Sequence, residues 1–139
     1  MKMDYNKTYN KILTDEEFME IKQHGSSAYP FQYYYDNLEL FDFHCIEWHW
    51  HREFEFLYVE SGQVTCGIGE KKIILSEGEA IFINSKILHQ FYASSDGVIP
   101  NFVCMPEFIA PENSLIYKKY ILPIISSCLL YTSDAADEL

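Results

Sequence analysis

Hydrophobic and polar residues alternate in short runs from about residue 31 to residue 105, and turn sequences separate the runs. The runs are FQYYY, LFDFHCIEW, EFEFLYVE, QVTCGIG, KKIILSEG, EAIFIN, QFYAS and NFVCM. The turn pairs between them are Ser61-Gly62, Gly69-Glu70, Glu77-Gly78 and Asp96-Gly97. Turn chemistry recurring roughly every ten residues between β-rich runs is typical of antiparallel sandwiches and barrels. We therefore expect antiparallel strands from about residue 30 to 106, in a mainly β unit of residues 31–112.

A short helix is expected before the strands. Thr14 followed by Glu17 makes a capping box at the start of the segment TDEEFMEIKQHG. Gly25 can end such a helix in a left-handed conformation. The pattern predicts a helix over residues 14–23, within an N-terminal segment of residues 1–30.

Helical spacing returns after the strands, in the segment ENSLIYKKYILPIISS. Ile116, Tyr120 and Ile124 fall on one side of a helix there, and Pro123 predicts a kink. We expect a kinked helix over residues 113–127 that packs outside the strands.

Composition narrows the class of protein. The 139 residues are about what one domain requires, and 48% hydrophobic residues supply one core. A formal net charge of −11 argues against docking on phosphate backbones, so this chain alone should not hold DNA. No apolar run approaches the length needed to cross a bilayer, which favours a soluble cytoplasmic protein without membrane contact. The four scattered cysteines are interpreted as buried free thiols.

The stretch HWHREFEFLYVESG, residues 49–62, carries the candidate chemistry. Side chains alternate faces along a strand, so His49, His51 and Glu55 share one face. Apolar Leu57 and Val59 continue that face, and aromatic residues occupy the other. The pattern predicts imidazole and carboxylate groups in an apolar-walled concavity, as in a barrel interior that holds something polar.

An ordinary structural role is the alternative for each of these side chains. A single histidine in a strand is usually hydrogen-bonded within the protein or exposed on its surface. An ordinary structural role explains less well two histidines and a glutamate on the same face of a strand. Glu53 is interpreted as a rim residue, and His24 and His44 have no such constellation around them. Trp48 has the opposite parity and is expected outside, unless a bulge turns it inward.

These residues resemble the two motifs of the cupins. The first motif, HxH, three residues, E, six residues, G, is matched by His49, His51, Glu55 and Gly62. The segment LSEGEAIFINSKILH is similar to the second, with Gly78 and Glu79 in its turn and His89 as its histidine. The chain departs from the pattern at Phe43, where a glycine is usual, and at Asn84, where a proline is usual. The resemblance implies a small antiparallel cupin barrel, a double-stranded β-helix or jelly roll.

Within the cupins, residues 8–127 resemble the N-terminal effector-binding half of AraC-type transcriptional regulators. The segments that carry the resemblance are FQYYYDNLELFDFHCIEWHWHREFEFLYVESG, GEAIFINSKILHQF and SLIYKKYILPI. In that family the barrel senses a small molecule, the following helix takes part in dimerisation, and a separate C-terminal domain with two helix-turn-helix units binds DNA. The resemblance implies a cytoplasmic ligand sensor sealed by its N-terminal segment. It also implies a weak homodimer through residues 113–127 and a DNA-binding half that this chain lacks.

Two function classes remain open. One is this sensor, and the other is a stand-alone metal-dependent cupin enzyme of the isomerase or dioxygenase type, because three histidines and a glutamate suit Fe, Mn, Ni or Zn. The helix SLIYKKYILPI favours the sensor, since a stand-alone enzyme barrel does not require it. The expected ligand-binding residues are His49, His51, Glu55, His89 and Phe91, of which the first four are the metal candidates. Aromatic walls beside polar groups favour a small polar effector such as a sugar.

The resemblance to the family ends abruptly at the last twelve residues, CLLYTSDAADEL. They resemble a translation of the transposase adapter used in preparing sequencing libraries. We therefore interpret residues 128–139 as a non-native tail and expect them to be poorly packed, with few contacts to the barrel. We also expect the intact gene to continue past Ser127 into a helix-turn-helix domain.

Overall fold

The computed structural model describes residues 10–127 and 131–134. Its strands are β1 (Phe31–Asn37), β2 (Cys45–His49), β3 (Phe54–Tyr58), β4 (Ser61–Gly62), β5 (Val64–Ile68), β6 (Lys71–Leu75), β7 (Ala80–Ile83), β8 (His89–Tyr92), β9 (Gly97–Cys104) and β10 (Tyr131–Asp134). Its helical segments are η1 (Leu38–Leu40), η2 (Asp42–His44), α1 (Pro106–Ile109), η3 (Tyr117–Ile121) and α2 (Leu122–Ile125).

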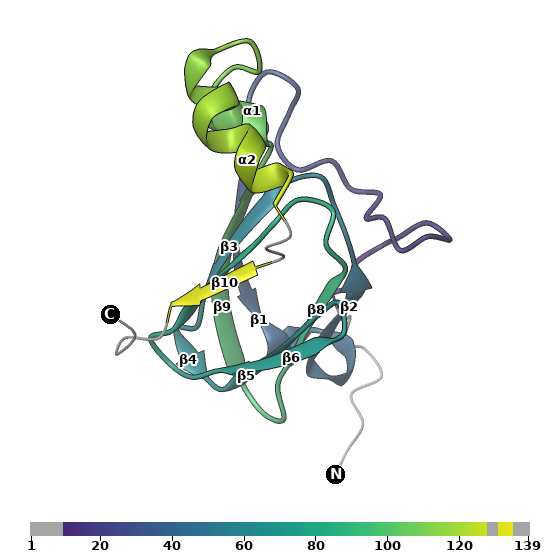
Figure 1. Cartoon of the computed structure of the whole chain (residues 1–139). Helices are drawn as coiled ribbons and strands as arrows, with labels where there is room; N and C mark the ends of the chain where they lie inside the picture. The colour runs from purple at the N-terminus through teal and green to yellow at the C-terminus, as the bar shows by residue number, and fades with distance from the viewer. Residues whose placement is uncertain (1–9, 128–130, 135–139) are drawn as a thin grey trace.

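The strands form two antiparallel sheets that enclose the core (Figure 1). One sheet has the order β1-β9-β3-β7-β10, with β4 paired to β9, and the other has the order β2-β8-β5-β6. Apolar side chains from both sheets fill the space between them, among them Leu57, Cys66, Ile83 and Ile99. Each predicted β-rich run overlaps one of these strands, and the expected mainly β, antiparallel barrel is confirmed.

The turn at Gly62 shows why the first motif ends in glycine. Gly62 has φ of +83°, and a Cβ there would lie 2.3 Å from the carbonyl oxygen of Asp96. Only glycine adopts this left-handed conformation without strain and leaves room for the neighbouring backbone. The turn therefore brings β4 against the start of β9.

The helix expected over residues 14–23 is absent, so that prediction is wrong. Instead, Asp15 Oδ1 accepts hydrogen bonds from backbone N–H groups two and four residues later, at 2.8 and 3.0 Å, and closes a tight turn. The backbone of Glu20 and Phe18 then bonds that of Trp50, through Glu20 N to Trp50 O at 2.9 Å and Trp50 N to Phe18 O at 3.0 Å. A helix this short is marginal by itself, so these tertiary bonds decide the conformation.

The C-terminal helix begins and ends close to the prediction. Residues 115–125 are helical, and the π-helical segment η3 lies just before Pro123. Proline has no N–H for the carbonyl four residues earlier, and its ring crowds that carbonyl, so the preceding turn widens. Tyr117 and Ile121 pack against Phe54 on the outer face of the first sheet. The helix thus lies outside the barrel as expected, and α1, which the pattern did not predict, precedes it (Figure 1).

The last described residues pair with the barrel. Residues 131–134 form β10, antiparallel to β7, so the expectation of few contacts is wrong for these four residues. An exposed strand edge pairs with an extended segment through backbone groups alone, and this pairing requires no particular side chains. Residues 128–130 and 135–139 lie outside the described residues. The non-native origin of the tail and the domain boundaries stay predictions.

Two further expectations concern the described residues. Cys45, Cys66 and Cys104 are free thiols, as predicted, but only Cys66 and Cys104 are buried, whereas Cys45 is half-buried. Burial raises the pKa of Cys66 to about 12. Cys128 lies outside the described residues. Within residues 10–127, no helix has both the length and the apolar character that spanning a membrane requires.

Candidate metal centre and cavity

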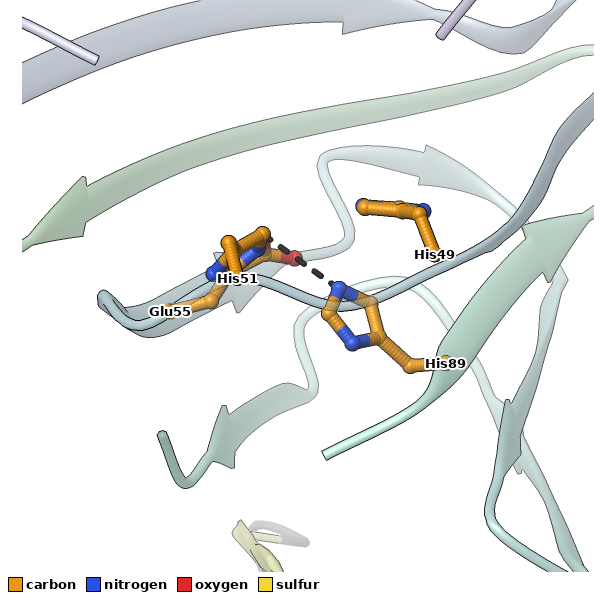
Figure 2. A group of neighbouring side chains, drawn as sticks. All are labelled: His49, His51, Glu55 and His89. Carbon is orange, nitrogen blue, oxygen red and sulfur yellow. Dashed lines mark hydrogen bonds and ion pairs between the residues drawn. The ribbon is translucent and has the colours of Figure 1, made fainter. Parts of the chain in front are cut away.

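Four buried polar side chains converge inside the barrel (Figure 2). His49 ends β2, His51 and Glu55 lie on either side of the turn into β3, and His89 begins β8. His49 and His89 face each other in the β2–β8 ladder, where a register shift follows Ile46. One ligand atom from each of the four residues lies within 4.8 Å of the others. The structure therefore brings together the four residues that the two motifs predicted. The parity argument itself is wrong, because residues 49–55 do not form one strand: β2 ends at His49, and β3, which carries Glu55, belongs to the other sheet.

Backbone carbonyls orient all three imidazole rings in the same way. In each histidine the Nδ1 atom lies within hydrogen-bond distance of a carbonyl oxygen two residues away along the chain. The distances are 2.8 Å from His49 to Glu47 O, 3.1 Å from His51 to Glu53 O and 2.7 Å from His89 to Ile87 O. Because a carbonyl only accepts, each Nδ1 carries the hydrogen, and in a neutral ring the Nε2 lone pair is then free for the cluster.

The Glu55 carboxylate lies among these Nε2 atoms. Its Oε1 is 3.2 Å from Nε2 of His51 and 3.8 Å from Nε2 of His89. His89 is 1% exposed, and its Nε2 has no hydrogen-bond partner among the described residues. His51 Nε2 thus lies within hydrogen-bond distance of Glu55, whereas Nε2 of His89 is buried without a partner, and a bound cation would satisfy this nitrogen.

Burial and mutual charge shift the pKa values of the cluster in different directions. Burial, reinforced by His89, lowers the pKa of His49 to about 3. Burial also disfavours the charged form of His51. The hydrogen bond to Glu55 and the negative charge of Glu55 outweigh this effect, so the pKa of His51 is raised. Burial would raise the pKa of Glu55, yet the hydrogen bond of His51 and the positive charge of His51 and His89 hold it well below its usual range. Glu55 is therefore a carboxylate, and His51 is the histidine that most readily holds a proton beside it.

The donor set matches what a divalent metal requires. Imidazole nitrogens with a carboxylate suit Fe, Mn, Ni and Zn. Metal-binding histidines ordinarily donate their other N–H to a carbonyl or carboxylate, as all three do here. His49, His51, Glu55 and His89 fit such an ion on these grounds.

A cavity of about 540 Å³ adjoins the cluster, within the range of small-molecule sites. His49 and Glu55 reach it from the cluster, and Phe41, Ile46 and Phe91 give it apolar walls. Phe91, expected as a wall residue, is 2% exposed, with its ring centroid 5.4 Å from that of His89. The structure therefore places the expected wall residue where a small ligand would lie.

Trp48 stays outside the cavity, as its parity predicted. It does not line the cavity, and a Cβ on Gly67 would lie 2.8 Å from Cη2 of its ring. Glu53 and His44 do not line the cavity either, although the Glu53 carbonyl orients His51.

The interpretation of His24 as isolated is wrong. Its Nε2 is 2.7 Å from Glu20 Oε1, its Nδ1 is 2.5 Å from the Tyr34 hydroxyl, and its ring centroid is 5.6 Å from that of His51. His24 and Glu20 are 6% and 7% exposed and line the cavity. Sequence reasoning missed them because it assigned their segment to a helix, whereas the segment crosses the cavity. The only sequence signal is the four-residue spacing of Glu20 and His24, which is common.

The two departures from the motifs have visible consequences. Phe43 takes the place of a usual glycine with φ of +56°, and its side chain is 85% exposed. Asn84 takes the place of a usual proline, and its Nδ2 donates to the carbonyl of Ile124 at 2.8 Å. Asn84 thereby ties the end of β7 to the C-terminal helix.

Comparisons with known proteins point to one fold and one regulator. The family described as "Cupin domain" matches residues 45–103. The chain is 28% identical over 119 residues to the HTH-type transcriptional regulator YdeC of Bacillus subtilis (strain 168), covering 84% of this chain and 40% of the relative. The chain thus spans about two fifths of the length of the curated relative it matches.

Among solved structures, an RmlC-like cupin from Shewanella frigidimarina is 17% identical, with a TM-score of 0.48 over 53% of this chain and 65% of that one. An oxalate decarboxylase from Bacillus subtilis with Mn(II) centres is 22% identical, with a TM-score of 0.40 over 44% of this chain and 18% of that one. The chain therefore spans less than two thirds of either of these two solved chains.

Proposed function

We propose that this chain, whose residues 45–103 match the cupin family, is the effector-binding part of an AraC-type transcriptional regulator. The observation that carries the binding role is the buried acceptor cluster beside a cavity of about 540 Å³. A polar cluster at the wall of an apolar cavity is what holding a small polar ligand requires. The regulator role is supported by the likeness to YdeC and by the helix at residues 115–125, which a stand-alone barrel does not require.

A divalent metal belongs to this proposal. His49, His51, Glu55 and His89 would hold it, and the ion would supply Lewis acidity to the site. The three backbone carbonyls keep the rings in the orientation in which Nε2 is free.

The proposed partners follow from the surface. Tyr117 and Ile121 of the C-terminal helix pack on the barrel, whereas Leu115, Ile116 and Tyr120 are 77%, 58% and 57% exposed. Apolar side chains exposed along one helix are suited to a twofold contact with a second copy. DNA binding belongs to a part of the regulator outside this acidic chain, whose net charge is −11.

Metal analysis of protein purified without an affinity tag, followed by calorimetric titration with Mn²⁺, Fe²⁺, Ni²⁺ and Zn²⁺, tests the metal part. A matched pair of variants, His89→Ala in the cluster and His44→Ala outside the cavity, separates site loss from general damage. Stoichiometric binding lost in His89→Ala alone supports the proposal. Equal binding by both variants contradicts it.

A thermal-shift screen of sugars, sugar acids and small aromatic acids tests the effector role. A ligand at a hundred times its dissociation constant stabilises the protein by about 2.7 kcal/mol. A ligand that stabilises the protein, and changes the DNA affinity of the longer regulator, supports the sensor. A complete lack of shift contradicts it.

A metal-dependent enzyme is the second candidate, because the cluster reaches a cavity large enough for a substrate. Turnover by metal-loaded protein of a compound that stabilises it would favour this candidate. Stable binding without turnover favours the sensor.

A further inference from the structure

The wall formed by β1 and β9 carries a second polar group, which includes none of the candidate metal ligands. Tyr34 and Asp36 lie two residues apart on β1, so they share a face, and Tyr34 pairs with Asn101 of β9. All three residues line the same cavity as His49 and Glu55. Neither sequence motif includes them.

Hydrogen bonds within the protein already use the hydrogens of Asn101. Its Nδ2 donates to Asp36 Oδ2 and to the Ile99 carbonyl, both at 2.9 Å. The side chain is 6% exposed, and its Oδ1 accepts no hydrogen bond from the residues that the structure describes. An amide has two N–H hydrogens, so Asn101 can offer a ligand only its oxygen.

The hydrogen of the Tyr34 hydroxyl is also used in a hydrogen bond within the protein. Glu20 only accepts, so Nε2 of His24, 2.7 Å from it, carries a hydrogen. In a neutral ring Nδ1 is then an acceptor, and the Tyr34 hydroxyl, 2.5 Å away, donates to it. The lone pairs of the Tyr34 oxygen remain available. Burial and nearby carboxylates raise the pKa of Tyr34, so the phenol keeps its hydrogen.

Asp36 completes the wall with a half-buried carboxylate that has one hydrogen bond from Asn101. Two exposed lysines, Lys11 and Lys22, also line the cavity, and Nζ of Lys22 lies 4.8 Å from the centroid of the Tyr34 ring. The Lys22 side chain is exposed, so it can move away from this position into solvent. The wall therefore presents oxygen acceptors from three side chains and no side-chain hydrogen of its own.

We propose that Tyr34, Asp36 and Asn101 form a donor-selective subsite, which binds hydroxyl or ammonium groups of the effector and rejects carboxylates. This inference rests on the proposed function, because it assumes that the effector occupies this cavity. A hydroxyl or ammonium group supplies the hydrogens that these acceptors lack, whereas a carboxylate adds like charge and more acceptors. The effector is therefore a polyol or an amine at this end, and acidic compounds are poor effectors unless their carboxylate lies elsewhere.

Three two-carbon compounds test this selectivity, because they share one hydroxyl and differ at the other end. Ethylene glycol, ethanolamine and glycolate are titrated into chelator-treated protein, and amide shifts are followed residue by residue in ¹⁵N NMR spectra. We expect ethylene glycol or ethanolamine to shift the amides around residues 34, 36 and 101 more strongly than glycolate. The order of these two probes distinguishes hydroxyl from ammonium recognition.

Asp36→Asn is the matched variant. Its side-chain oxygen can still accept from Asn101, but it loses the charge and brings a hydrogen donor to the wall. We expect about tenfold weaker ethanolamine binding, which corresponds to about 1.4 kcal/mol, and a gain for glycolate. Unchanged selectivity in this variant overturns the inference, as does glycolate binding equal to the others in the original protein or no shift at this wall with any probe.

A metal titration of the same samples separates this test from the proposed function. Donor selectivity without metal binding leaves the subsite standing and removes the metal from the proposal. Metal binding without donor selectivity overturns the subsite alone. Normal metal binding by Asp36→Asn shows that the variant is folded.

Discussion

Acidification of the metal-free protein should lower its free energy of unfolding through His49. This ring is only 3% exposed, and its burial favours the neutral form. The pKa of His49 is lowered from 6.5 to about 3 in the folded state. The unfolded chain therefore binds a proton below pH 6.5 that the folded protein refuses, and stability falls as the pH falls. Each pH unit in this window costs about 1.4 kcal/mol at most.

From pH 6.5 to 4.5, His49 thus removes about 2.3 kcal/mol, a large part of the stability of a small domain. The neighbours act differently in this window. The pKa of His51 is raised, so its contribution is fully present below about 6.5 and is lost only as the pH rises through its folded value. The pKa of Glu55 is lowered, so its contribution is lost only as the pH falls below about 4.5. His49 therefore dominates between the two values.

Urea unfolding of chelator-treated protein at several pH values measures this effect. The His49→Gln variant, which cannot titrate there, should lose much less stability than the original protein between pH 6.5 and 4.5. His44→Gln is the matched control, since His44 does not line the cavity, and it should keep the original slope. Parallel stability curves for the original protein and His49→Gln would refute the reasoning.

Four further outcomes are expected. Metal affinity should fall as the pH drops through about 6, because protons compete for the imidazole nitrogens, and calorimetry at several pH values checks this. Gly62→Ala should lower stability by about 1–3 kcal/mol in urea unfolding, because φ is +83° and Asp96 O blocks the Cβ. Asn84→Ala should cost about 1 kcal/mol and speed amide hydrogen exchange in α2, since it removes the bond to Ile124 O. Ile116→Asp should weaken self-association without unfolding the chain, because this side chain is 58% exposed, and a strictly monomeric original protein in sedimentation at high micromolar concentration would contradict the dimer.

The strands and the core of the site could be predicted from sequence because they depend on short-range rules. Alternation and turn residues located the β-rich runs, and the spacing of the first motif identified His49, His51 and Glu55. Parity along one strand is not what unites them, because β2 and β3 belong to different sheets. The second motif added His89 from a distant strand, which parity alone could not do. Departures such as Phe43 did not disturb this, because the backbone takes the left-handed conformation there without a glycine.

Only the tertiary structure decided the rest of the cavity. The local sequence around Glu20 and His24 predicts a helix. Backbone hydrogen bonds to Trp50 instead hold this segment in a non-helical conformation that lines the cavity. The acceptor wall of Tyr34, Asp36 and Asn101 joins residues of two strands that are far apart in the sequence. Local preferences are worth tenths of a kcal/mol per residue, whereas burial and hydrogen bonds between distant segments are worth several, so the latter determine which side chains face the ligand.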